Sequence, residues 1–356
     1  MRPCATTPTA TVASAASTKA TPSAALTRAA RHFCYAEAMM NRLSVVAVLA
    51  ALAFAACKPE TQTPPPATVP GPEKRLAEHV VIISIDGCRP DVMLRAGSPN
   101  LRALMQRGSF NMYAETTYVA ITLPSHTSML TGVTPERHRI TWNKDRPREE
   151  LRSPAFPTLF DVAKKHGLST AMIAGKSKLD ALTLSGAVDF VEVAKEVAGS
   201  DDVAVGEKAA AIITAHKPNV TFVHLANTDV TGHSLGWGTA EQMAAINLAD
   251  QAVGIIVKAI NDAGVTDKTL VIVSADHGGS GITHGKNDPR SRYIPWICVG
   301  PDVREDHDLT LERGRTIRTE DTFATACYFL NIPIDPRIDG RPVMNLFTDR
   351  ELLQPK

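Results

Sequence analysis

From His79 onward, short and continuously apolar runs alternate with longer segments of helical periodicity. Apolar runs rich in Val and Ile are typical of strands that are buried on both faces of a sheet. The strand-like runs are HVVIISID, STAMIAG, VTFVHLA and TLVIVSAD, and the helical segments are NLRALMQRG, FPTLFDVAKKHG, VGEKAAAIITAH and AEQMAAINLADQAVGIIVKAINDAG. The pattern predicts an α/β fold: a largely parallel central sheet with helices on both faces, arranged as a three-layer sandwich.

The residues before this pattern have a different composition. Residues 58–77 are rich in Pro and Thr, which is typical of an extended linker. Residues 40–57 hold one Arg, an apolar run and small residues before a cysteine, the layout of a secretory signal. Because that signal is complete by itself, we interpret residues 1–39 as the product of a start codon placed too far upstream. No repeat or second linker follows, so residues 78–356 are expected to form one catalytic domain.

The signal segment ends in a cysteine, Cys57, which directly follows two alanines. This resembles the lipobox of bacterial lipoproteins, in which the cleaved chain begins with a lipid-bearing cysteine. A lipid on Cys57 would hold the protein at the periplasmic face of a bacterial membrane. The alternative is a plain signal peptide with an incidental cysteine, which would give a secreted or periplasmic protein.

Charge and cysteine spacing exclude several classes of protein. The formal net charge of +1 gives no global field that would attract a nucleic-acid polymer. An anionic substrate must therefore be held locally, by metal ions or by placed lysines. Six cysteines without a CxxC pair indicate neither a zinc ribbon nor a disulfide scaffold. Cys298 and Cys327 lie in apolar runs, where we expect them to be buried in a strand and a helix.

Acidic residues and a histidine follow three of the predicted strands. Asp86 ends the first strand, Asp229 follows VTFVHLANT, and Asp276 and His277 end TLVIVSA. In open α/β sheets, ligands bind just beyond the carboxyl ends of the strands. These side chains are therefore predicted to meet at one edge of the sheet and to form a metal site there.

Two further histidines extend this set of ligands. His233 follows Asp229 by four residues, so one helical or turn-like stretch can aim both at one point. His284 follows in GITHG, and Gly278 and Gly279 permit a tight turn and a close approach. Sets of carboxylates and imidazoles suit zinc, with manganese or iron as alternatives.

A candidate nucleophile, Thr122, stands in AITLPSHTSMLTG. Pro124 can open a helix at its first turn, which would place Thr122 just ahead of the helix N-terminus. The helix dipole and the free N–H groups there favour a developing anion. The alternative is that Thr122 serves only as an N-cap.

Taken together, these motifs resemble the alkaline phosphatase superfamily, and most closely its type I phosphodiesterase/nucleotide pyrophosphatase branch. The resemblance covers about residues 79–347. The motifs that carry it are Asp86-Gly87-x-Arg89-x-Asp91, Thr122-x-Pro124-x-His126 with Thr131-Gly132, Asp229-x3-His233, Asp276-His277-Gly278, His284-Gly285 and the turn Asp339–Pro342.

The resemblance implies a zinc-dependent phosphohydrolase that cleaves small-molecule phosphate esters through a phosphothreonine intermediate. It implies two Zn²⁺ per chain. Asp229, His233 and His284 would hold one zinc, and Asp86, Asp276, His277 and the Thr122 oxygen the other. Thr122 would be the nucleophile, and Asn143 would donate to a phosphate oxygen. Phosphodiesters are the expected substrates.

Lys176 and Lys178 resemble paired cationic positions of phosphomonoesterases and phosphonoacetate hydrolases of the superfamily. They are predicted to bind a dianionic phosphate or a substrate carboxylate, and the alternative is two solvated loop lysines. A sulfatase is not favoured, because Thr122 and His126 stand where C-x-P-x-R would place its cysteine and arginine. A non-catalytic ligand-binding lipoprotein is the alternative from another class. The sequence does not indicate the oligomeric state.

Overall fold

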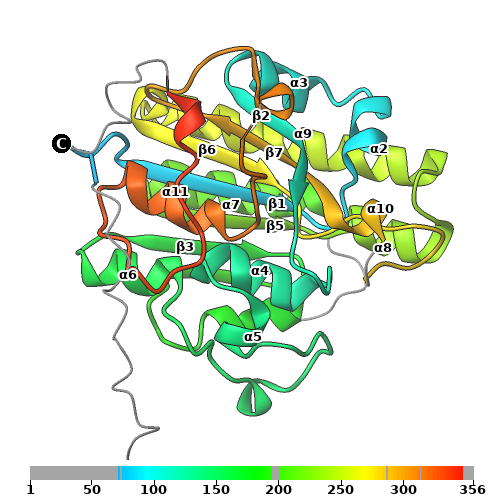
Figure 1. The fold of residues 1–356 in the computed structure, drawn as a ribbon, viewed down its shortest axis with the longest axis horizontal. Coiled ribbons are helices and arrows are strands. Elements are labelled where there is room, and N and C mark those ends of the chain that lie inside the picture. Colours follow the sequence, from blue (N-terminus) through cyan, green and yellow to red (C-terminus); the bar gives the residue numbers. More distant parts are fainter. Residues whose placement is uncertain (1–70, 73, 195–200, 286–287, 313, 348–356) are drawn as a thin grey trace, which may run out of the picture. The chain divides into compact units, whose positions relative to one another are not determined.

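The structure is a computed structural model, and it describes residues 71–72, 74–194, 201–285, 288–312 and 314–347. The predicted leader, the signal segment with Cys57 and most of the predicted linker lie outside these residues. The described strands form one sheet in the order β4-β3-β5-β1-β6-β7-β2-β8 (Figure 1). The strands are β1 (His79–Ile85), β2 (Ser109–Glu115), β3 (Thr170–Ala174), β4 (Phe190–Val193), β5 (Val220–Leu225), β6 (Thr269–Ser274), β7 (Tyr293–Val299) and β8 (His307–Asp308).

The prediction of a largely parallel sheet is confirmed. Strands β4, β3, β5, β1 and β6 pair in parallel, and β7 pairs antiparallel with both β6 and β2. Every residue of β1, β3, β5 and β6 is buried. Continuous burial explains why these strands lack the alternation of apolar and polar residues that a half-exposed strand shows.

The described helices cover both faces of this sheet, as predicted (Figure 1). Helices α7, α8 and α9 pack together on one face, and α4, α6 and α11 pack on the other. The α-helices are α2 (Pro90–Arg95), α3 (Pro99–Gln106), α4 (Thr122–Thr131), α5 (Pro135–His138), α6 (Leu159–Lys165), α7 (Asp202–His216), α8 (Asn227–Leu235), α9 (Ala240–Asp262), α10 (Pro289–Arg292) and α11 (Asp321–Phe329). The 3-10 helices are η1 (Arg148–Glu150), η2 (Ser177–Leu182), η3 (Thr266–Lys268), η4 (Leu309–Leu311) and η5 (Met344–Leu346).

Helix starts follow the local chemistry of the sequence. Thr158 and Asp161 form a capping box at α6, and the Thr239 side chain accepts from the backbone at the start of α9. Helix α9 is long and apolar enough to cross a membrane, but half of its most apolar stretch is buried and it packs on α7 and α8. We therefore assign α9 to the core of the domain.

The two cysteines that were expected to be buried are buried. Cys298 lies in β7 and Cys327 in α11, each with no exposed surface. Burial raises the pKa of both thiols, so they remain protonated and serve as small apolar side chains.

Candidate metal centre

The four neighbouring strands β3, β5, β1 and β6 each deliver a charged side chain to the same edge of the sheet. Lys176 follows β3, Asp229 follows β5 in the first turn of α8, Asp86 follows β1, and Asp276 follows β6. Parallel pairing places the carboxyl ends of these strands side by side, which brings together residues that are far apart in the sequence.

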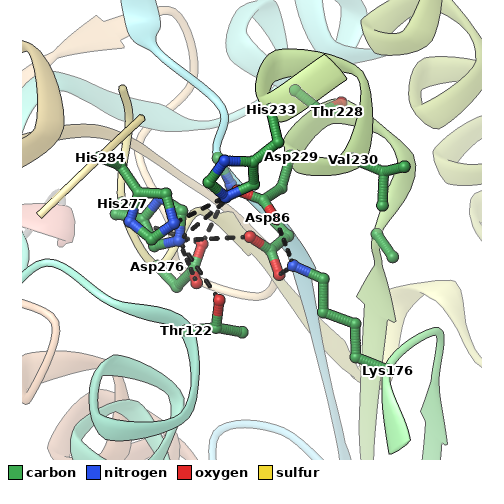
Figure 2. A network of polar contacts seen from close by, with 12 residues as sticks. Asp86, Thr122, Lys176, Thr228, Asp229, Val230, His233, Asp276, His277 and His284 are labelled. Carbon is green, nitrogen blue, oxygen red and sulfur yellow. Dashed lines mark hydrogen bonds and ion pairs between the residues drawn. The ribbon is translucent and has the colours of Figure 1, made fainter. Parts of the chain in front are cut away.

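The structure brings the predicted metal ligands into two groups, shown in Figure 2. Within each group the ligand atoms all lie within 4.8 Å of one another. The first group is Asp229, His233 and His284, and the second is Asp86, Asp276 and His277.

Distances in the first group centre on one oxygen of Asp229. Its Oδ1 lies 3.5 Å from Nε2 of His233 and 3.7 Å from Nε2 of His284. Helix α8 explains the first contact, since residues four apart lie on the same helix face. Tetrahedral zinc with bonds of about 2.0 Å needs donor atoms roughly 3.3 Å apart. The first group is therefore close to zinc geometry.

In the second group, Nε2 of His277 is the central donor atom. It lies 3.2 Å from Oδ2 of Asp276 and 3.4 Å from Oδ1 of Asp86. The hydroxyl oxygen of Thr122 is also 3.4 Å from this nitrogen. The His277 and His284 rings stack with centroids 3.6 Å apart, so the two groups are in direct contact.

Three buried carboxylate oxygens of these groups accept no hydrogen bond from the described residues: Asp86 Oδ1, Asp229 Oδ1 and Asp276 Oδ2. Unsatisfied buried carboxylate oxygens are expensive unless a cation neutralises them. These are the same atoms that face the histidine nitrogens. Two divalent cations, one in each group, would satisfy all three oxygens, so the residues fit a binuclear metal centre.

Backbone carbonyl groups fix the orientation of each ligand histidine. Nδ1 of His233 contacts the Ile282 carbonyl at 3.0 Å, and Nδ1 of His284 contacts the Ala120 carbonyl at 2.9 Å. Nδ1 of His277 contacts its neighbouring carbonyl, that of Gly278, at 2.8 Å. A carbonyl only accepts, so each Nδ1 carries the proton and each Nε2 is left with its lone pair for a metal.

Burial and charge set the protonation states of the centre. Burial and the neighbouring His284 lower the pKa of His277 to about 3, and burial lowers the pKa of His284. Both rings are therefore neutral at pH 7, as metal ligands must be. Burial and the charge of Asp86 raise the pKa of Asp276 well above its usual range. A cation beside Asp276 would favour its ionised form.

Thr122 is placed differently from the sequence prediction. It is the first residue of α4 rather than the residue ahead of it, and the N-cap is Ile121, with no side-chain capping bond. The alternative that Thr122 is only an N-cap is therefore wrong. Pro124 lies within the first turn, where the missing N–H has no helical partner to lose. The buried Thr122 hydroxyl consequently points at the second metal group from a helix N-terminus.

Asn143 lies in the loop after α5, and the Leu123 amide donates to its Oδ1 at 2.9 Å. This contact determines how the side-chain amide is oriented, because the backbone N–H requires an acceptor. The Asn143 NH₂ group is left as a donor beside the first turn of α4. That orientation suits the predicted contact with a phosphate oxygen, which stays a prediction.

Lys176 and Lys178 both have protein partners. The buried ammonium of Lys176 lies 2.6 Å from Asp86 Oδ2 and 2.5 Å from Asp229 Oδ2 (Figure 2). Lys178 donates to the backbone carbonyl of Asn143 at 2.9 Å. Lys176 is therefore not a solvated loop residue, and its predicted contact with substrate stays a prediction.

Sequence reasoning assigned no role to three residues that support the ligands. His224 Nε2 donates to Asp86 Oδ2 at 2.9 Å. His126 lies between the Thr122 carbonyl and the Ser84 hydroxyl, at 2.8 Å from each. Trp237 donates to the Gly87 carbonyl at 2.8 Å, and its ring lies edge-on to His233. His224 pairs with Ser84 in the parallel register of β5 and β1, so its place beside Asp86 can be predicted only once the order of these strands is known.

The two glycines after His277 were predicted to permit a tight turn and a close approach, and the structure shows the close approach. A Cβ on Gly278 would lie 2.1 Å from the Arg290 carbonyl oxygen, and one on Gly279 would lie 2.2 Å from Cε2 of Trp237. Neither glycine has a positive φ. The segment therefore needs glycine because there is no room for a side chain, not because of a tight turn.

Solved structures show that this fold is shared with ectonucleotide pyrophosphatase/phosphodiesterases and with sulfatases. Murine ectonucleotide pyrophosphatase/phosphodiesterase 5, in an inactive form in complex with AMP, aligns with a TM-score of 0.62 at 15% identity, covering 76% of this chain and 100% of that one. A 2-O GAG sulfatase aligns equally well, with a TM-score of 0.62 at 16% identity over 76% of this chain and 74% of its own. These alignments show the fold, which phosphodiesterases and sulfatases share.

Sequence comparison identifies the family. Residues 80–297 match the family described as type I phosphodiesterase / nucleotide pyrophosphatase, and the match covers more than half of the chain. The chain belongs to this family, as its motifs predicted.

Individual relatives are distant. Rat ectonucleotide pyrophosphatase/phosphodiesterase family member 3 is 23% identical over 233 residues, which cover 61% of this chain and 27% of that protein. The bis(5′-adenosyl)-triphosphatase enpp4 of Mus musculus is 24% identical over 215 residues, covering 57% and 47%. This chain thus spans less than half the length of either relative.

Proposed function

We propose that the protein is a zinc-dependent phosphohydrolase that cleaves phosphodiesters through a phosphothreonine intermediate. One observation carries the proposal: the Thr122 hydroxyl oxygen lies 3.4 Å from Nε2 of His277, and His277 belongs to one of the two adjoining groups of metal ligands. A threonine hydroxyl is a weak nucleophile until a neighbouring group lowers its pKa. Zinc at the two groups would act as a Lewis acid, lowering the pKa of this hydroxyl and neutralising phosphate charge.

Thr122 and the protein groups around it have separate roles in the proposed reaction. The Thr122 oxygen attacks phosphorus, and the bond to the leaving alcohol oxygen breaks on the opposite side. The N-terminal end of α4 stabilises the developing negative charge. The Asn143 NH₂ group donates to a phosphate oxygen that is not part of the broken bond. Hydrolysis of the phosphothreonine then regenerates the hydroxyl.

Nucleotide-like phosphodiesters are the substrate class that we favour. The family is one of phosphodiesterases and nucleotide pyrophosphatases, and a murine relative of the same fold is described with AMP. The alternative is a phosphomonoesterase or phosphonoacetate hydrolase, which would need cationic groups directed at a dianion. The protein contacts of Lys176 and Lys178 give that alternative less support.

Side-by-side turnover of bis(p-nitrophenyl) phosphate and p-nitrophenyl phosphate by the zinc-loaded protein tests the substrate class. We expect the diester to be the better substrate by kcat/KM. Acid quenching during turnover, followed by peptide mass spectrometry, should find phosphate on Thr122. A faster monoester would shift the assignment to a phosphomonoesterase. No turnover and no bound zinc would instead favour a ligand-binding protein.

We propose that the chain is attached to a bacterial membrane, facing the periplasm, through a lipid on Cys57. Support comes from the apolar run that ends in Ala-Ala-Cys and from the Pro-rich segment behind it. Cys57→Ser should release the protein from the membrane fraction or leave its precursor uncleaved. Unchanged membrane association in that variant would overturn the proposal.

A further inference from the structure

We infer that Lys176, Ser177 and Lys178 form a positioning clamp that ties the Asn143 loop to the metal ligands and does not bind substrate. This inference rests on the proposed function. The three consecutive residues stand at the start of η2, directly after strand β3. Lys176 contacts the metal ligands, and Ser177 and Lys178 contact the loop that carries Asn143.

The first contact of the clamp joins the two metal groups. The Lys176 ammonium binds Oδ2 of Asp86, from the second group, and Oδ2 of Asp229, from the first. Strand order explains the reach, because β3 neighbours β5, and β5 neighbours β1. With Oδ2 of each carboxylate held by Lys176, Oδ1 of each is turned toward the histidine nitrogens.

The other two contacts of the clamp hold the loop that carries Asn143. The Ser177 hydroxyl lies 2.6 Å from Asp145 Oδ1, and Lys178 donates to the Asn143 carbonyl at 2.9 Å. The Asn143 side chain in turn accepts from the Leu123 amide, next to Thr122. A continuous chain of bonds therefore runs from the metal ligands through the clamp to the nucleophile.

The charge and exposure of Lys176 fit positioning better than substrate binding. Its side chain is only 4% exposed, and two carboxylates already occupy its ammonium. The ammonium is therefore held between the carboxylates of Asp86 and Asp229. The ammonium holds these carboxylates in place irrespective of the ester that is bound.

A double-mutant cycle separates a clamp from a substrate contact. Lys178→Met should lower kcat/KM by about ten- to a hundredfold, the range for loss of a charged hydrogen bond. The loss should be equal for the monoester and the diester. In a protein that already carries Asn143→Ala, Lys178→Met should not lower kcat/KM any further, because both changes act through the Asn143 amide. Lys144→Met, which removes an exposed lysine from the same loop, is the matched control and should retain full activity.

Two results would overturn the clamp. One is a loss of kcat/KM in the Lys178→Met/Asn143→Ala double variant that equals the product of the two single losses. The other is a loss of kcat/KM that is confined to the monoester. Either would mean that Lys178 touches substrate. If Asn143→Ala leaves kcat/KM unchanged, the proposed role of Asn143 is wrong. The Tm of Lys176→Met would then decide for or against the clamp.

Lys176 is tested without measuring activity. Removing its charge leaves Asp86 and Asp229 unpaired in the zinc-free protein, whereas bound zinc partly replaces that charge. Lys176→Met should therefore lower Tm by several degrees in the zinc-free protein, and by less when zinc is saturating. Lys268→Met, which breaks an exposed ion pair with Glu78, is the control and should shift Tm little in either state.

An unchanged Tm of zinc-free Lys176→Met would overturn the clamp. If Lys176→Met does not fold, Lys176→Arg keeps the charge but not the shape. We expect Lys176→Arg to fold with a Tm near that of the native protein and to lose kcat/KM equally on both esters. A native kcat/KM in Lys176→Arg would show that the position does not set the geometry of the centre.

Discussion

The Thr122 hydroxyl oxygen and Nε2 of His277 lie 3.4 Å apart, and the same nitrogen faces Asp276 and Asp86 at 3.2 and 3.4 Å. Nδ1 of His277 holds the ring proton, since it donates to the Gly278 carbonyl. The hydroxyl oxygen and two carboxylate oxygens therefore each lie from this nitrogen at a distance close to the donor separation of tetrahedral zinc. The geometry favours a shared metal over proton transfer from Thr122 to His277.

Thr122→Ala should abolish turnover and leave the zinc content nearly unchanged, because three protein ligands remain in the second group. Losing the nucleophile should lower kcat by more than about a hundredfold. The measurements are steady-state kinetics and zinc content on the same sample. Thr127→Ala removes a buried hydroxyl from the same helix and should keep most of the activity. Retention of more than about a hundredth of the native rate in Thr122→Ala would rule out the covalent route.

His284→Ala should reduce the zinc content from two ions per chain to one, because only Asp229 and His233 would remain in the first group. Inductively coupled plasma mass spectrometry after dialysis checks this. His216→Ala removes an exposed histidine that stacks on Phe190, and it should keep both ions. Two tightly bound ions in the His284 variant would contradict the assignment of the first group.

Gly279→Ala should destabilise the protein and weaken zinc binding at the first group. Its Cβ would lie 2.2 Å from Trp237, whose ring lies beside His233. Overpacking of this kind costs about 1–3 kcal/mol in unfolding free energy. Gly281→Asn is the control, because its φ of +59° suits asparagine and its site is open. Urea unfolding and zinc titration of both variants provide the comparison, and equal effects in the two would refute the steric argument.

His138 should make the folded state sensitive to acid. Burial lowers the pKa of His138 to about 4 from its ordinary value of 6.5. The ring is held neutral, since Nδ1 accepts from the Ile140 amide and Nε2 contacts Ser128. The unfolded chain therefore takes up this proton more readily, so stability that is present above pH 6.5 is lost as the pH falls toward 4. The loss approaches about 3 kcal/mol.

Unfolding free energies of the native protein and of His138→Gln, measured from pH 7 to pH 4 in the zinc-free state, isolate this contribution. The Gln variant should be less stable at pH 7 and should have a shallower decline toward acid. Parallel curves for the two proteins would mean that other groups cause the acid sensitivity.

The strands and the gathering of ligands were predictable because both depend on local patterns. Strands β1, β5 and β6 are apolar runs that end at polar residues, and parallel pairing brings those ends together without further information. The His233 position follows from helical spacing alone. These features need only short segments of sequence and one general rule of sheet topology.

The direction of Lys176 was not predictable in the same way. Whether its ammonium reaches Asp86 or a substrate depends on which strands lie between β3 and β1, and strand order is a property of the whole sheet. The first residue of α4 also differed from the prediction, because Ile121 caps the helix with its backbone alone. The close approach of Trp237 to Gly279 carries no local sequence signal at all.

The carbonyl groups that orient the three ligand histidines have a consequence for divergence. Residues 120, 278 and 282 contribute through the main chain, which every amino acid supplies. Ile282 has an exposed side chain, so its replacement leaves the tautomer of His233 unchanged, provided that the backbone path is kept. Ala120 is buried with a φ of +46°, and a Cβ on Gly278 would collide with the Arg290 carbonyl. The backbone path at these two positions, and not only the set of Asp and His residues, therefore decides whether a chain can form this centre.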